Sequence, residues 1–139
     1  MSKKCTVIIT EDDKEDADFL QQAFINSSFT GNIQHLGDGV QLMNKLSELK
    51  NTGTLPELIV LDLNMPYKNG LEVLEEMNND PEYKKIPVAV LTASLHHQDE
   101  ENCGSLGCDL FIRKPIRFDE YNHIAERMVV HIRERFSYC

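Results

Sequence analysis

The sequence predicts a single α/β domain with flavodoxin-like architecture: a doubly wound, five-stranded parallel sheet in the order 2-1-3-4-5, with helices on both faces. Three observations lead to this prediction. Five short apolar runs alternate along the chain with amphipathic segments, which is the pattern of successive βα units around a parallel sheet. Three of these runs are almost continuously apolar, as strands covered on both faces are. The length, 139 residues, is that of one domain.

The five apolar runs are the expected strands. Their sequences are CTVII, NIQHL, ELIVL, PVAVL and DLFIR, at residues 5–9, 32–36, 57–61, 87–91 and 109–113. Each run is far shorter than a segment that spans a membrane.

Between the strands, apolar residues recur three or four positions apart, as they do on the buried face of a helix. The residues expected on these buried faces are, in chain order, Ala17, Leu20 and Phe24; Val40, Met43 and Leu46; Leu71, Leu74 and Met77; and Phe118, Tyr121, Ile124, Ala125, Met128, Val129 and Ile132. The last of these faces is the most regular, and we expect it to cover the sheet.

The segment between the fourth and fifth strands differs from the others. Its sequence, HHQDEENCGSLG at residues 96–107, has few apolar residues and contains Gly104. Both features weaken a helix, because they lower its propensity and leave little surface to pack. We expect a short or mobile helix that phosphorylation or a partner orders; a well-packed helix stabilised by its neighbours is the alternative. Strong protection from hydrogen exchange without phosphate would contradict the expectation.

The composition is ordinary for a globular protein, and the charge is acidic. Hydrophobic residues make up 41% of the chain, charged residues 27%, and the net charge is −9. A protein that binds nucleic acid needs clustered basic residues, and an acidic surface disfavours anionic membranes. The N-terminus, MSKKCTVII, lacks the long apolar run of a signal peptide. We therefore expect a cytoplasmic protein whose partners include neither nucleic acid nor membrane.

The chain has four cysteines: Cys5, Cys103, Cys108 and Cys139. Their spacing matches no zinc-binding pattern, since there is no C-x-x-C and no pair of histidines at ligand spacing. We expect four free thiols in a reducing compartment.

Acidic residues directly follow two of the expected strands. Glu11, Asp12 and Asp13 come after the first strand, and Asp62 comes after the third. The carboxyl ends of parallel strands meet at one edge of the sheet, where such folds bind ligands. Clustered acids are costly unless a cation compensates them, and oxygen ligands without Cys or His favour Mg²⁺. The alternatives are a helix N-terminus for residues 11–13 and a turn for Asp62.

Two further polar residues end the fourth and fifth strands, namely Thr92 and Lys114. A carboxylate such as Asp62 can attack phosphorus, and phosphoryl transfer then needs mainly positioning and positive charge. Lys114 and a metal could supply that charge, and the Thr92 hydroxyl could donate a hydrogen bond. Taken singly, Thr92 is better explained as a strand-end cap and Lys114 as part of a surface loop. Together with the acids, all at the same end of successive strands, they indicate a site.

Four segments that carry these residues, TVIITEDD, LIVLDLNMPYKNGLEVL, VAVLTAS and LFIRKPI, resemble the response-regulator receiver domain of two-component signalling. The resemblance covers nearly the whole chain. The stretch from LDLNMPYKNGLEVL to NDPEYKKIPVAVLTAS is particularly similar to single-domain regulators that include the cyanobacterial phytochrome response regulator. The resemblance implies that residues 1–139 form one receiver domain without an output domain.

The same resemblance assigns a role to each residue of the site. It implies that Asp62 accepts the phosphoryl group and also binds Mg²⁺. Asp12 would bind the metal directly, Glu11 mainly through a metal-bound water, and Asn64 through its backbone carbonyl. Asp13 lies beyond the matched acidic pair, and we expect it to cap the following helix.

Three further roles come from the resemblance. Thr92 would be the switch hydroxyl, and Lys114 would pair with the phosphoryl oxygens. Phe111 falls where the family has an aromatic switch residue, often Tyr, so that here the hydroxyl is absent; a core Phe is the alternative. The Lys114–Pro115 peptide bond is implied to be cis. Gly70 is expected to supply a backbone conformation that a side chain would oppose.

The function that follows from the resemblance is signalling, not enzymatic turnover. A sensor histidine kinase, with a phytochrome as one candidate, would phosphorylate Asp62, and a change of conformation would reach a downstream protein. The last helix and the tail FSYC (residues 136–139) could support a homodimer. Their apolar residues Val130, Phe136 and Tyr138 are more than the helix needs to cover the sheet, and such an excess raises the chance of a partner surface.

Three other functions fit the sequence less well. A Mg²⁺-dependent phosphatase with an aspartyl nucleophile typically has an acid two residues later, where this chain has Asn64. A flavin-binding electron carrier needs a phosphate-cradling loop after the first strand, where EDDKED would repel phosphate. An adaptor that has lost phosphorylation is disfavoured by the complete set of Asp62, Thr92 and Lys114.

Overall fold

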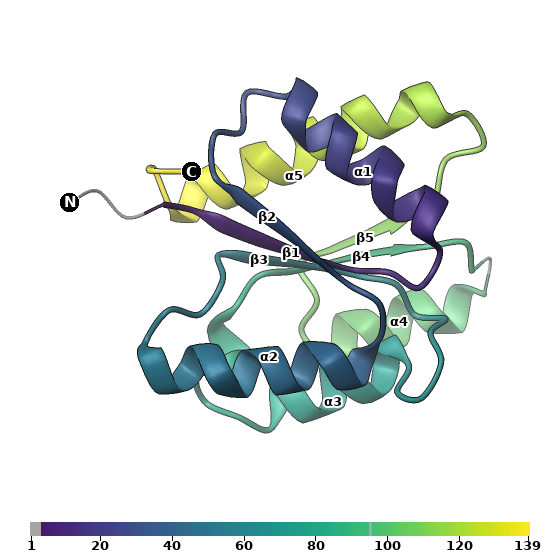
Figure 1. Ribbon diagram of the computed structural model, residues 1–139. Helices are drawn as coiled ribbons and strands as arrows, with labels where there is room; N and C mark the ends of the chain where they lie inside the picture. The colour runs from purple at the N-terminus through teal and green to yellow at the C-terminus, as the bar shows by residue number, and fades with distance from the viewer. Residues whose placement is uncertain (1–3, 95) are drawn as a thin grey trace.

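In the computed structural model, which describes residues 4–94 and 96–139, five parallel strands form one sheet in the order β2-β1-β3-β4-β5. The strands are β1 (Thr6–Thr10), β2 (Asn32–Leu36), β3 (Leu58–Leu61), β4 (Val88–Thr92) and β5 (Leu110–Arg113). The helices are α1 (Lys14–Asn26), α2 (Gly39–Thr52), α3 (Gly70–Asn78), α4 (His97–Ser105) and α5 (Tyr121–Arg135), with 3-10 turns η1 (Tyr83–Lys85) and η2 (Phe118–Glu120). Helices α1 and α5 cover one face, and α2, α3 and α4 cover the other (Figure 1). The predicted fold is confirmed.

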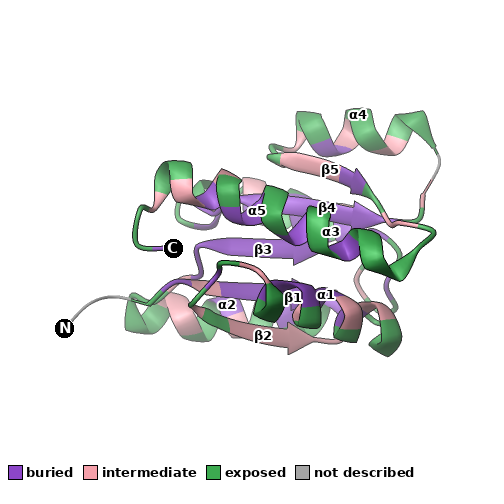
Figure 2. Ribbon diagram, turned by 90° about the horizontal axis from the view of Figure 1, so that it is seen from above, coloured by how far each residue is buried: buried purple, intermediate pink, exposed green. Residues whose placement is uncertain are grey.

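The central strands are buried on both faces (Figure 2). Successive side chains of a strand point to opposite faces, so Val7 and Ile9 of β1 pack beneath α1 and α5, whereas Ile8 packs beneath α2 and α3. Every residue of β3 and β4 is buried as well. This double burial explains why these runs are almost continuously apolar in the sequence.

Four strands begin one residue later than expected, and β1 and β4 also end one residue later. The added residues, Thr10 and Thr92, continue the hydrogen-bonded ladders: Thr10 pairs with Leu36 and Leu61, and Thr92 pairs with Arg113. As a consequence, Glu11 directly follows the last residue of its strand.

The buried helix faces follow the expected periodicity, with two exceptions. Val40 is 40% exposed, because the buried face of α2 is formed by Leu42 and Leu46, from which Val40 points away. Phe118 is 69% exposed and lies in η2, before α5 begins. Its ring stacks on Phe19 of α1, with ring centroids 5.7 Å apart.

The β3–α3 loop folds back tightly over the end of β3. The backbone N–H of Gly70 donates to the carbonyl of Leu63 at 3.0 Å, and a Cβ on Gly70 would lie 2.5 Å from the carbonyl oxygen of Asp62. A side chain is opposed at Gly70, as expected, but not through an unusual φ, because the glycines with positive φ among the described residues are Gly53 and Gly107. Glycine is required here by the close approach of two backbone segments.

Two of the four cysteines are bonded to each other, so the expectation of four free thiols is wrong for them. Cys5, just before β1, forms a disulfide with Cys139, because the start of β1 and the segment after α5 lie at the same end of the sheet, with the two cysteine Cα atoms 5.1 Å apart. Cys103 and Cys108 are free.

Helix α4 is short, as expected, with nine residues, of which Cys103 is the buried one. That α4 is mobile stays a prediction.

The expectation of a cis Lys114–Pro115 bond is wrong: all peptide bonds of the described residues are trans, which is also the isomer of lower intrinsic energy. No helix among residues 4–94 and 96–139 has the length and apolar character needed to cross a membrane.

Replacing Gly70 by alanine should destabilise the protein by about 1–3 kcal/mol, because the new Cβ would collide with the backbone of Asp62 and Leu63. The matched control is Gly104→Ala in α4, where a Cβ would meet nothing within 4 Å; it should stabilise the protein by about 0.5–1 kcal/mol. Urea unfolding measures both. Equal effects of the two substitutions would contradict the close-approach argument.

Candidate functional site

Three carboxylates gather where β1 and β3 end. These strands are neighbours in register, with Thr10 opposite Leu61, so Glu11 and Asp62 leave the sheet side by side. One oxygen of each of Glu11, Asp12 and Asp62 lies within 4.8 Å of the others. Glu11 and Asp62 are only 5% and 4% exposed, whereas Asp12 is exposed. The cluster is therefore buried on one side and open to solvent on the other.

Lys114 places a positive charge among these acids. Its Nζ lies 2.7 Å from Oε1 of Glu11 and 2.9 Å from Oδ2 of Asp62. The lysine follows β5, and its backbone N–H donates to the carbonyl of Thr92 at 2.8 Å, which holds it at the same edge of the sheet. The structure thus brings together Glu11, Asp12, Asp62 and Lys114.

Asp16 is a further member of the site that the sequence reasoning missed. It lies in the first turn of α1, and its Oδ2 accepts a hydrogen bond from Lys114 Nζ at 2.9 Å. Its backbone N–H donates to Asp13, which caps α1 as expected. The sequence did contain a signal for this contact. Helix α1 begins shortly after β1 ends, so acidic residues in its first turn, such as Asp16, lie near the same edge of the sheet as Glu11. Lys114 therefore contacts three carboxylates.

Glu11 is held in place from two sides. The backbone N–H of Asp13 donates to Oε2 of Glu11 at 3.1 Å, and the ring Nε2 of His35 donates to its carbonyl at 2.7 Å. These contacts connect the acid to α1 and to the end of β2. Its position is therefore set before any ligand arrives.

The shared burial changes how these groups hold protons. Burial raises the pKa of Glu11 to about 8; the charge of Asp62 also raises it, while the hydrogen bond from Lys114 opposes the change. Burial works against the charge of Lys114, but its hydrogen bonds to Glu11, Asp16 and Asp62 outweigh this and raise its pKa. At neutral pH and without a bound cation, the site therefore holds a charged lysine beside a glutamate that keeps its proton most of the time.

The remaining predicted residues lie around this cluster. The backbone N–H of the exposed Asn64 donates to Oδ1 of Asp62 at 3.1 Å. Thr92 is buried, and its hydroxyl oxygen accepts from the backbone N–H of Ser94 at 3.3 Å. Phe111 is half-buried against the core beneath α2, α3 and α4. Among the described residues, no hydrogen bond joins Thr92 to Asp62, and the switch roles of Thr92 and Phe111 stay predictions.

The donor set fits a hard divalent cation. All three clustered ligand groups are carboxylates, and the exposed Asp12 leaves a path from solvent. Mg²⁺ is usually bound by one or two carboxylates and keeps several waters, which an open, one-sided cluster allows. One ammonium among several carboxylates leaves negative charge that an added cation would balance.

Comparisons with known proteins agree with this geometry. Residues 7–126 match the family described as the response regulator receiver domain. The response regulator Rcp1 of Synechocystis sp. is 39% identical over 97 residues, which are 68% of this chain and 65% of Rcp1. The probable methanogenesis regulatory protein FilR2 of Methanothrix harundinacea is 30% identical over 123 residues, which are 88% of this chain and 79% of FilR2.

Solved structures are also similar. The crystal structure of the phosphorylated cyanobacterial phytochrome response regulator RcpA superimposes with a TM-score of 0.83 and 31% identity, covering 91% of both chains. The Mn²⁺-bound form of Rcp1 gives a TM-score of 0.79 and 29% identity, again covering 91% of both chains. An acidic cluster such as Glu11, Asp12 and Asp62 is typical of the metal site of receiver domains.

In the absence of divalent cations, the raised pKa of Glu11 should make stability depend on pH. A glutamate whose pKa is higher in the folded state than its unfolded value of 4.5 stabilises the fold while protonated. That stability is present below about pH 4.5 and is lost as the pH rises to about 8. The measurement is the free energy of unfolding in urea with chelator between pH 4.5 and 8.

Glu11→Gln keeps the shape of the side chain and removes the proton, so the decline with pH should become shallower. The exposed Glu15→Gln is the matched control and should keep the wild-type slope. A Glu11→Gln protein whose slope equals that of the wild type would show that Glu11 titrates normally.

Proposed function

Since the chain belongs to the response regulator receiver domain family, we propose that it accepts a phosphoryl group on Asp62 from a sensor histidine kinase and signals to a partner protein by a change of conformation. It is a phosphoacceptor signalling protein and not a conventional enzyme. The observation that carries the proposal is the position of Asp62, a nearly buried carboxylate between the Lys114 ammonium and an acidic pair suited to a metal.

The chemistry at Asp62 follows from its two oxygens. Oδ1 accepts from the backbone N–H of Asn64, and Oδ2 accepts from Lys114. A carboxylate oxygen attacks the phosphorus, the bond between phosphorus and the imidazole nitrogen of the kinase breaks, and Asp62 becomes an acyl phosphate. Lys114, already at the carboxylate, is within reach of the phosphoryl oxygens, whose negative charge it stabilises.

Glu11, Asp12, Asp62 and the backbone carbonyl of Asn64 are the residues that would hold Mg²⁺. When bound, the ion neutralises the charge that develops on the phosphoryl oxygens. The chain itself contributes the positions of the acids, which β1, β3 and the His35 contact hold before the ion binds. Asn64 stands where a phosphatase would need a general acid or base, which disfavours turnover of a phosphomonoester.

We further propose that Thr92 and Phe111 transmit the change. A phosphoryl group on Asp62 adds a hydrogen-bond acceptor near the end of β4, and Thr92 can leave its contact with Ser94 to donate to it. Phe111 in β5 pairs with Val90 of β4, two residues before Thr92. Movement of the hydroxyl would leave space toward which the ring can turn. A phosphorylated site thereby shifts an existing equilibrium between two conformations.

One of the similar proteins suggests a kinase partner for this chain. RcpA is a phytochrome response regulator, and we propose a sensor histidine kinase, with a phytochrome as the first candidate, for this chain too. We also propose a cytoplasmic location, because the ATP that supplies such a kinase is found there. We propose in addition that the receiver domain acts by itself, without an output domain. A homodimer through α5 and the tail remains a prediction, which a sedimentation profile that stays monomeric at all concentrations would contradict.

The phosphoacceptor is tested with acetyl phosphate and intact mass. Wild-type protein with Mg²⁺ should gain one phosphoryl group, in an adduct stable in acid and labile in base; Asp62→Asn and chelator should each abolish the gain. Asp18→Asn, an exposed substitution in α1, is the control for the lost charge and should react normally. A folded, Mg²⁺-binding wild type that neither acetyl phosphate nor a histidine kinase modifies would instead be an adaptor.

Metal binding should depend on Asp12 and not on its neighbour. Asp12→Asn should weaken Mg²⁺ or Mn²⁺ binding by at least roughly tenfold, since even groups that only support metal ligands contribute about that much. Asp13→Asn removes the same charge but preserves the helix cap, because Asn caps as well as Asp, and it should change affinity little. Isothermal titration calorimetry measures the metal affinity of both variants. Equal losses of affinity would show that the overall negative charge attracts the ion and that Asp12 is not a specific ligand.

A further inference from the structure

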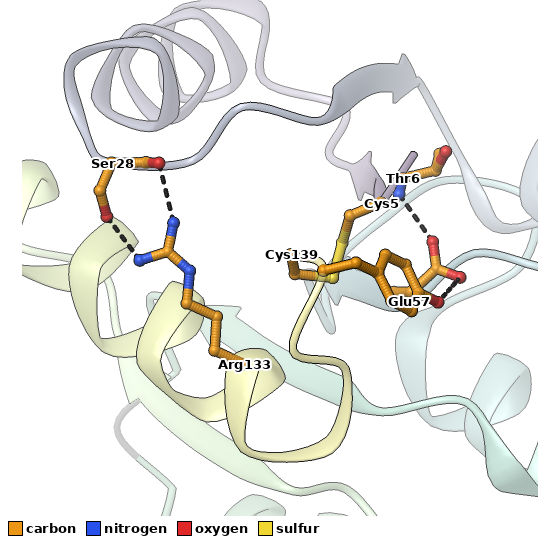
Figure 3. The surroundings of a disulfide bond; sticks show 7 residues. Cys5, Thr6, Ser28, Glu57, Arg133 and Cys139 are labelled. Atoms are coloured by element: carbon orange, nitrogen blue, oxygen red, sulfur yellow. Dashed lines mark hydrogen bonds between the residues drawn. A yellow bond between two sulfur atoms is a disulfide. The ribbon is translucent and has the colours of Figure 1, made fainter. Parts of the chain in front are cut away.

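The disulfide between Cys5 and Cys139 joins the two ends of the described chain across 134 positions (Figure 3). Both residues are buried, at 1% and 4% exposure. They lie at the opposite end of β1 from Glu11, since Cys5 precedes the strand and Glu11 follows it. The bond is thus separate from the proposed phosphorylation site.

Cys5 is the fixed half of the pair. Its carbonyl accepts from the backbone N–H of Asn32 at 2.8 Å, and the N–H of the next residue, Thr6, donates to Oε1 of Glu57 at 2.8 Å. These bonds hold Cys5 in place at the start of β1. A Cys5 thiol would therefore stay in the same place whether or not it is bonded to Cys139.

Cys139 belongs to a four-residue tail, residues 136–139, that follows α5. The tail leaves the helix with an extended backbone at Phe136. Besides the disulfide, it is held by the Tyr138 hydroxyl, which donates to Oε2 of Glu57 at 3.0 Å, and by the Cys139 N–H, which donates to the carbonyl of Phe136 at 3.0 Å. Phe136 also packs, half-buried, against the core, and Cys139 is itself buried there, so the disulfide ties an ordered tail to the start of the sheet.

Helix α5 does not need the tail to stay docked. Met128, Val129 and Ile132 are completely buried against the sheet. Arg133 donates from both terminal nitrogens to Ser28, to its Oγ and its carbonyl, at 2.8 Å each (Figure 3). Opening of the disulfide would therefore free the Cys139 thiol and leave the helix in place.

We propose that Cys5 and Cys139 are a redox modification site, a reversible dithiol–disulfide couple that fastens the C-terminal tail when oxidised and releases it when reduced. The reversibility rests on the proposed cytoplasmic location, because disulfides in reducing compartments are usually transient. Cys5, held at the start of the sheet, and Cys139, on a tail that α5 does not need in order to stay docked, are the two partners of this couple.

The oxidant is a small-molecule disulfide of the glutathione type. The thiolate of one cysteine attacks its S–S bond, a mixed disulfide forms, and one small thiol leaves. The second cysteine then attacks the mixed disulfide, forming the Cys5–Cys139 bond and releasing the second small thiol. Two electrons and two protons pass from the protein to the small molecule, and a dithiol reductant reverses the sequence.

The chain supplies an internal comparison in its other two cysteines. Cys108 donates its backbone N–H to the carbonyl of Cys103 at 3.0 Å across Gly107, whose φ is +88°, in the cap that ends α4. Both are free thiols in the same structure. A Cys103→Ala/Cys108→Ser variant therefore isolates the proposed couple, and Cys139→Ser removes it while sparing Cys103 and Cys108.

The test exposes wild type and both variants to oxidised or reduced glutathione, and then counts and maps free thiols by alkylation and mass spectrometry. Wild type should show two free thiols when oxidised and four when reduced. The Cys103→Ala/Cys108→Ser variant should melt roughly 10 °C lower when reduced, as expected for the loss of a disulfide that closes a long loop. Cys139→Ser should show no such redox-dependent shift. Carboxypeptidase should remove residues of the tail from the reduced form only and stop at α5.

Three results would overturn the proposal. They are four free thiols after oxidation, a Cys5–Cys139 bond that persists in excess reduced glutathione, and a disulfide between two chains in place of one within the chain. The acetyl phosphate assay is run on both redox forms, so that a failure of Asp62 to react is seen independently of the thiol count.

Discussion

The burial of like charges at one edge of the sheet is the constraint on which the site depends. Glu11 and Asp62 are both nearly inaccessible, and two such carboxylates repel each other unless a cation stands between them. Lys114 meets that need at 2.7 and 2.9 Å. Because Asp12 and Asp16 add further negative charge, one ammonium does not balance the cluster. Burial, together with the charge of Asp62, raises the pKa of Glu11, and the remaining negative charge of the cluster suits a divalent cation.

The sheet makes this arrangement rigid. Glu11 and Asp62 follow two hydrogen-bonded neighbours, β1 and β3, both of which are buried on both faces, so neither acid can move without disturbing the core. The close approach of Gly70 to the Asp62 carbonyl brings the β3–α3 loop back across the same strand end. Rigid placement of the reacting group suits phosphoryl transfer, in which positioning contributes more than covalent chemistry by the protein.

The two ends of β1 carry different chemistry and are held in different ways. At its carboxyl end, the charged cluster is enclosed by several elements. At its amino end, the tail at residues 136–139 is held by the disulfide, the Tyr138 hydrogen bond, a local turn and the packing of Phe136 against the core. The fold can in this way carry a modification at each end without placing one in contact with the other.

The sequence by itself determined the strand order, the burial of the central strands and the edge at which Glu11, Asp12, Asp62 and Lys114 meet. These features follow from local periodicity and from the rule that parallel strands end together. Tertiary structure decided the rest: the contact of Asp16 with Lys114 across 98 positions, the Cys5–Cys139 bond across 134, and the reason for glycine at position 70. Each of these depends on the distance between segments that are far apart in the chain or folded back on each other, and a one-dimensional pattern carries no such distance.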